Sequence, residues 1–164
     1  MQWVLLVLVV AGFFVIELKL YRDRKRLAPI RAAVKQEAVV FSSPISAQWG
    51  RGWWGRGNAR GMRLVVRERS LELSFPFPGG SLLATEWYCR GNDARMKMGR
   101  GNFLPPWVTR DCIVLSIPAI DDAGAEQEIL ISSAPPWRHD LSAAWDALVA
   151  CGVQASGPPP EDRA

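Results

Sequence analysis

The segment from residue 49 to residue 61 combines two residue types that often bind anionic or aromatic partners. Its sequence, WGRGWWGRGNARG, interleaves three tryptophans with arginines and glycines. Tryptophan stacks on nucleic-acid bases and sits well at a membrane surface, and arginine pairs with the phosphates of both. The same composition also suits a tight hairpin in which glycine adopts positive φ and tryptophan fills a core. Three interpretations are therefore open: nucleic-acid contact, membrane contact and a structural hairpin.

The distribution of charge helps to separate these interpretations. Residues 17–37 hold seven Lys or Arg against three Asp or Glu, which equals the net charge of +4, whereas residues 38–164 hold thirteen of each. A neutral domain counts against a nucleic-acid partner, because such binding depends mainly on phosphate neutralisation. Basic residues close to a bilayer are instead attracted to anionic lipid headgroups. We therefore predict no nucleic-acid partner, and contact with the lipid bilayer and its anionic headgroups through Arg22, Arg24, Lys25, Arg26, Arg51, Trp53, Trp54 and Arg56.

Residues able to catalyse a reaction or to bind a metal are sparse. The sole histidine, His139, has no closely spaced cysteine pair to complete a zinc site and no recognisable nucleophile motif nearby. Asp121 and Asp122 are adjacent acids in an expected hairpin loop, without the regularly spaced ligands that calcium needs. We predict no catalytic residue, no cofactor and no metal site. The three cysteines are expected to be buried, reduced thiols: Cys89, Cys112 and Cys151.

The first element that would position these residues is an N-terminal helix. Trp3–Ile16 is an unbroken apolar run of 14 residues, and a basic cluster follows it at residues 22–26. A bilayer span needs roughly 20 residues, a length that is reached only when Glu17 and Lys19 lie in the interface. Positive charge after a span keeps the following residues inside. The sequence therefore predicts a transmembrane anchor at residues 1–21 of a single-pass inner-membrane protein, with the N-terminus out and the C-terminal domain cytoplasmic.

A cleaved signal peptide and an amphipathic or buried helix are the alternatives to this anchor. A signal peptide has a basic region before its apolar core and a small-x-small cleavage site after it. Neither feature is present here, since no Lys or Arg precedes the apolar run. Residues 22–38 mix charge with apolar residues at helical spacing and predict a basic juxtamembrane stalk.

From Val39 onward, short apolar stretches between Gly, Pro, Asn and Asp residues predict a mostly-β domain. Leu64–Val66 and the alternating apolar residues at 71–75 flank Arg67–Ser70 as a strand, a turn and a strand. Met96 and Met98 occupy alternate positions of another expected strand and are predicted to lie in the core. The remaining strand candidates are residues 39–45, 48–54, 81–89, 94–98, 112–117 and 128–132, with a hairpin loop at 120–124.

One helix is expected at the end of the domain. Asp140 is a suitable N-cap and Gly152 a suitable C′ residue. Between them, one helical face is apolar and comprises Leu141, Ala144, Trp145, Leu148 and Cys151. Residues 154–164, rich in glycine, proline and acids, predict a disordered tail.

About seven antiparallel strands followed by one amphipathic helix resemble the pleckstrin homology-like barrel. The segment LSAAWDALV at residues 141–149 resembles the helix that closes this barrel, in which a tryptophan packs over one open end. With its N-terminal span and basic stalk, the chain resembles small membrane-anchored bacterial proteins that carry such domains. The resemblance implies a pleckstrin homology-like domain at residues 39–153. It does not extend to phosphoinositide binding, because the first hairpin offers only Arg51, Arg56 and Arg60, set among glycines.

These features together predict a membrane-anchored cytoplasmic module that binds or scaffolds a protein partner and has no catalytic activity. The alternative function is a structural subunit of an envelope or transport complex that acts through its transmembrane span. The two differ in which part of the chain makes the essential contact.

Overall fold

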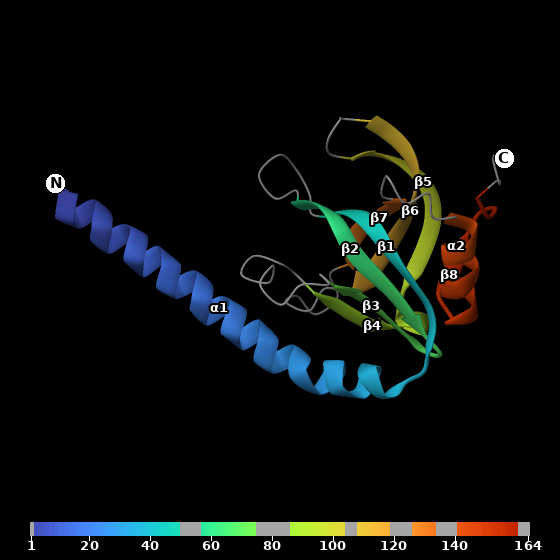
Figure 1. The fold of residues 1–164 in the computed structure, drawn as a ribbon, viewed down its shortest axis with the longest axis horizontal. Helices are drawn as coiled ribbons and strands as arrows, with labels where there is room; N and C mark the ends of the chain where they lie inside the picture. Colours follow the sequence, from blue (N-terminus) through green and yellow to red (C-terminus); the bar gives the residue numbers. More distant parts are fainter. Residues whose placement is uncertain are drawn as a thin grey trace. The chain divides into compact units, whose positions relative to one another are not determined.

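The computed structural model describes residues 2–49, 57–74, 86–103, 108–118, 126–133 and 141–160. The chain divides into two compact units, Met1–Gln36 and Glu37–Ala164. Helix α1 (Gln2–Gln36) makes up the first, and a sheet with a second helix makes up the other (Figure 1). The elements of the second unit are β1 (Val39–Trp49), β2 (Gly57–Arg67), β3 (Ser70–Ser74), β4 (Trp87–Arg90), a 3-10 turn (Gly91–Asp93), β5 (Arg95–Phe103), β6 (Val108–Pro118), β7 (Glu126–Ser133), α2 (Leu141–Ala150) and β8 (Gln154–Ser156).

Helix α1 continues from the apolar N-terminal run into the charged segment. Among the residues that the structure describes, no helix combines the length and the apolar character that crossing a membrane requires. This finding corrects the predicted transmembrane anchor at residues 1–21, its topology and the single-pass inner-membrane location. The strictly apolar run ends at Ile16, where Glu17 and Lys19 follow, and is shorter than the roughly 20 residues of a span.

The eight strands that the structure describes form one sheet in the order β4-β3-β2-β1-β7-β6-β5-β8 (Figure 1). Neighbouring strands are antiparallel, except that β5 and β8 run parallel. In the described part of the chain, β4 and β8 are the two edges and do not pair with each other, so the sheet is open. The prediction of a closed pleckstrin homology-like barrel was therefore wrong. Alternation along the chain specifies strands and their faces, but it carries no information on whether two distant edges pair.

The strand, turn and strand predicted around residues 67–70 are present as the β2–β3 hairpin. Leu64 lies opposite Leu73, and Val66 lies opposite Leu71. All four side chains are fully buried on the inner face. The register follows from the pattern, because a slip of one residue would turn the apolar side chains of the shifted strand toward the other face.

A bulge interrupts the β1–β2 ladder. Ile45 lies opposite Met62, whereas the next residue, Ser46, lies opposite Arg60. The extra residue, Gly61, has a φ of +74°, a conformation that glycine adopts without steric cost. Bulges of this kind bend the strand and increase its twist.

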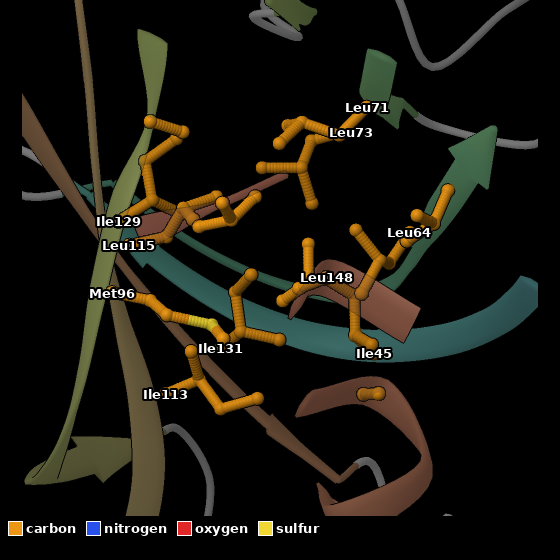
Figure 2. Packing of buried hydrophobic residues seen from close by; sticks show 14 of the residues in the cluster. Ile45, Leu64, Leu71, Leu73, Met96, Ile113, Leu115, Ile129, Ile131 and Leu148 are labelled. Atoms are coloured by element: carbon orange, nitrogen blue, oxygen red, sulfur yellow. The ribbon is translucent and has the colours of Figure 1, made fainter. Parts of the chain in front are cut away.

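The core lies between the inner face of the sheet and helix α2. Figure 2 shows side chains from the sheet and from α2 converging on one cluster: Ile45, Leu64, Leu71, Leu73, Met96, Ile113, Leu115, Ile129, Ile131 and Leu148. They come from β1, β2, β3, β5, β6, β7 and α2. Met96 is buried, and Met98 is partly buried against the same cluster, which confirms the predicted core position of both.

Two tryptophan contacts show how strongly the sheet curls. Trp49 on β1 and Trp87 on β4 meet edge to face with ring centroids 5.0 Å apart, although β2 and β3 separate their strands. The Trp87 Nε1–H donates a hydrogen bond to Gln127 Oε1 on β7 at 3.2 Å. Strands distant in the sheet order therefore face one another across the core.

Helix α2 packs against β1 and β6. Trp145 and Leu148 are buried and Asp146 is exposed, so the predicted apolar face is confirmed. The Val153 N–H donates to the Leu148 carbonyl at 3.0 Å, and the Gly152 N–H donates to the Val149 carbonyl at 2.9 Å. With a φ of +99° at Gly152, this is a Schellman motif, which confirms Gly152 as the C′ residue and leads the chain into β8.

Candidate functional site

The residues predicted to contact lipid are only partly described by the structure. Arg51, Trp53, Trp54 and Arg56 lie outside the described residues. The basic cluster Arg22, Arg24, Lys25 and Arg26 lies on α1, where Lys25 is exposed. Contact of these residues with a bilayer or with anionic headgroups stays a prediction.

Trp49, the first tryptophan of the segment at residues 49–61, has a structural role. It lies at the end of β1 and packs against the core cluster through its edge-to-face contact with Trp87. Such an aromatic pair contributes about 0.5–1.5 kcal/mol beyond the burial of its area. The structural interpretation of the segment is therefore confirmed for this residue.

The cysteines have the properties of buried thiols. Burial raises the pKa of Cys89 to about 12, with smaller contributions from Cys151 and Asp93. Burial and the neighbouring Asp111 raise the pKa of Cys112 to about 11. Cys112 and Cys151 are buried and Cys89 is partly buried, and all three are free. A thiol of such high pKa is a poor nucleophile near neutral pH, because the thiolate is the reactive form.

The other residues considered for chemistry are not brought together by the described structure. Asp121, Asp122, His139 and Asp140 lie outside the described residues. Within the described ranges, no group of three His, Cys, Asp or Glu side chains is arranged to hold a metal ion.

A polar cluster that the sequence did not predict attaches Glu37 to the β2–β3 turn. The Glu37 Oε2 accepts hydrogen bonds from the Arg69 N–H at 3.1 Å and from the Ser70 hydroxyl at 2.7 Å. The Arg67 Nη1 donates to the Glu37 main-chain carbonyl at 2.8 Å. These bonds attach the chain that enters β1 to a turn more than 30 residues away. The sequence around Glu37 gives no sign of this role, because an acid before a strand usually has none.

Arg67 extends this cluster across the outer face of the sheet. Its Nη2 lies 3.5 Å from Glu72 Oε2, and the Ser74 hydroxyl donates to Glu72 Oε1 at 2.9 Å. Arg67 Nε is buried and has no hydrogen-bond partner in the structure as described. The Arg67 and Glu72 side chains are about nine-tenths buried (11% and 10% exposed), so this ion pair is shielded from solvent. Its role is structural, since a partner molecule has little access to it.

The feature best suited to bind a partner is the free edge of β8. Among the described strands, β8 pairs with β5 alone, where Arg95 lies opposite Gln154 and Lys97 lies opposite Ser156. The Gln154 N–H donates to the Ala94 carbonyl at 3.1 Å. Alternate residues of a parallel strand bond to the same neighbour, so Ala155, between Gln154 and Ser156, directs its N–H and C=O away from β5.

The two edges of the sheet differ in accessibility. All three residues of β8 are exposed, and the described part of the chain places no strand beyond them. On β4, by contrast, Trp87 and Tyr88 are only 2% and 5% exposed. Exposed main-chain groups on an edge strand are a template for pairing with another chain. The β8 edge is therefore the accessible one.

The residues next to this edge are basic or neutral. Arg95 and Lys97 on β5 are exposed, and their partners in register on β8, Gln154 and Ser156, carry no charge. Sequence reasoning missed this site because residues 154–156 fall in the predicted tail, where three polar or small residues show no alternation.

Comparison with known proteins adds no family to these observations. No protein-family model matches the chain, and neither a curated protein nor a solved structure matches it significantly.

Proposed function

We propose that the unit Glu37–Ala164 is a protein-binding module that accepts an extended segment of its partner as an added strand beside β8. The observation that carries the proposal is the Ala155 N–H and C=O pair, which is directed away from β5 on an exposed edge strand. In strand addition, main-chain hydrogen bonds give affinity and alternate side chains give specificity. The sequence predicted only a binding or scaffolding module. The proposal specifies the mode of binding, which is strand addition, and the binding site, which is the edge of β8.

The residues after β8 limit how far such a ladder extends. Gly157 follows the strand directly, and Pro158, Pro159 and Pro160 follow Gly157. Proline has no N–H to donate and is one of the devices that protect an edge from unlimited pairing. The added ladder is therefore confined to a few residues around Ala155, which suits short, reversible binding and disfavours aggregation.

Replacing Ala155 with proline tests the proposal. Ala155→Pro removes the outward N–H and leaves the Gln154 and Ser156 groups that bond to β5. The matched control, Ala155→Val, keeps the N–H and favours extended backbone. The probe is an uncharged extended peptide, acetyl-Thr-Val-Ser-Val-Thr-amide, titrated into the full chain and followed through backbone amide resonances.

We expect the peptide to shift the Ala155 and Gly157 amide resonances in the wild type and in Ala155→Val. The proline variant should bind at least about tenfold more weakly, as for the loss of a directed hydrogen bond. Slow exchange of the Gln154 amide in the proline variant would establish that β8 stays paired with β5. Equal binding by both variants, or no response of the wild type to the peptide, would overturn the proposal.

A further inference from the structure

We infer that the segment added beside β8 carries acidic side chains at alternate positions, on the face that displays Arg95 and Lys97. This inference rests on the strand addition proposed above and specifies the chemistry of the partner. It is drawn from the placement of charge around the β8 edge.

The strand next to β8 presents two basic side chains on one face. Arg95 and Lys97 are two residues apart on β5, and successive side chains of a strand point to opposite faces. Between them, Met96 points into the core and is buried. Because Gln154 and Ser156 are neutral, the first charges that an added strand meets on this face are both positive.

The acids on the same sheet lie farther from the edge. Neighbouring strands are about 4.8 Å apart, so a strand added beside β8 lies about 10 Å from β5 and about 19 Å from β7. Glu126 and Glu128 are on β7. Charges at an exposed surface are largely screened beyond about 8 Å at physiological ionic strength. The Lys97 side chain is long enough to approach this range. The Arg95 guanidinium lies toward β7, 3.8 Å from Glu126 Oε1, and the β7 acids are farther from the edge.

Local ion pairs leave this positive charge available. Arg95 Nη1 lies 3.8 Å from Glu126 Oε1, and both side chains are more than half exposed, so the pair is weak. Lys97 has no ion-pair partner among the described residues. Strand β5 itself contains no acid, and the acid closest to it in sequence is Asp93, in the 3-10 turn before Arg95. The acidic positions of the partner are therefore expected opposite Lys97 and Ser156, toward the end of β8.

The other face of the added strand meets different surroundings. On that face, β5 contributes Met96 to the core, and Ala155 lies opposite it on β8. Side chains of the partner that alternate with its acids are accordingly expected to be small or apolar. The recognition pattern is an acidic residue, an apolar residue and an acidic residue in extended conformation.

Three matched peptides test this inference with the full chain. The probes are acetyl-Glu-Val-Glu-Val-Glu-amide and the same peptide with Gln or Lys in place of Glu. We expect the Glu peptide to bind about fivefold more tightly than the Gln peptide, as for two exposed ion pairs, and the Lys peptide to bind most weakly. This preference should shrink at high salt.

Two substitutions on β5 locate the effect. Lys97→Glu should reverse the preference between the Glu and Lys peptides. The matched control is Arg100→Gln, because Arg100 is a basic residue of the same strand that pairs with Asp111 at 3.3 Å and lies on the opposite face. This control should leave the preference unchanged.

The outcomes separate the inference from the function on which it rests. Equal binding of the Glu and Gln peptides by the wild type would overturn the acidic partner and leave strand addition intact. An unchanged preference in Lys97→Glu would do the same. Absence of binding by all three peptides, together with the uncharged peptide above, would overturn both proposals.

Discussion

Single residues in this protein act over long sequence separations, and Glu37 is the clearest case. Its carboxylate accepts two hydrogen bonds from the β2–β3 turn, and its carbonyl accepts a third from Arg67. The carboxylate bonds depend on the side chain, whereas the carbonyl bond does not. The sequence around Glu37 does not indicate that it bonds to the β2–β3 turn.

Glu37→Ala is therefore expected to lower the free energy of unfolding by about 1–2 kcal/mol, because two hydrogen bonds to a partly exposed carboxylate are lost. The control is Glu68→Ala, an exposed acid at the same turn, which should change stability by less than about 0.5 kcal/mol. Urea unfolding of both variants provides the measurement. Equal losses would show that net charge at the turn, and not the Glu37 contacts, sets the stability.

At the scale of elements, helix α2 was predictable and strand β8 was not. The spacing of Trp145 and Leu148 indicates the buried face of α2, and Gly152 marks its end. Strand β8 forms because Ala94 and the following residues of β5 offer main-chain groups to it. Its own sequence carries no strand pattern, so only the neighbouring strand decides its conformation.

Trp145→Ala is expected to destabilise the protein by about 3–5 kcal/mol, as for truncation of a buried aromatic side chain in a core. Asp146→Ala, on the exposed face of the same helix, should be nearly silent. Thermal unfolding followed by circular dichroism distinguishes the two. A comparable loss of melting temperature from both substitutions would contradict the orientation of α2 described above.

At the scale of the whole molecule, the second unit contains a complete core. Every residue of the main hydrophobic cluster lies between Ile45 and Val153. A fragment with residues 37–164 should therefore fold on its own, with a melting temperature within a few degrees of the full chain. A fragment with residues 39–164, which lacks Glu37, should melt at a lower temperature. Circular dichroism of both fragments provides the test, and an unfolded 37–164 fragment would show that the sheet unit requires α1.

Local patterns in the sequence determined the faces and ends of several elements. Three such signals span only a few residues each, so they can be recognised from the sequence alone. They are the alternation at Leu71 and Leu73, the helical spacing of Trp145 and Leu148, and the glycine at position 152. Charge distribution likewise separated a basic segment from a neutral domain. The same local reasoning extended the apolar run into a membrane span and the strands into a closed barrel, and both extensions were wrong.

Only the tertiary structure decided which strands meet. The pairing of β1 with β7, the contact of Trp49 with Trp87 and the attachment of Glu37 to Ser70 join residues far apart in the chain. The exposed edge at Ala155 exists because β8 pairs with β5 on one side and with no described strand on the other. Such features depend on the free energy of many long-range contacts formed together, which no local spacing encodes. For that reason the candidate binding edge became visible only in the folded chain.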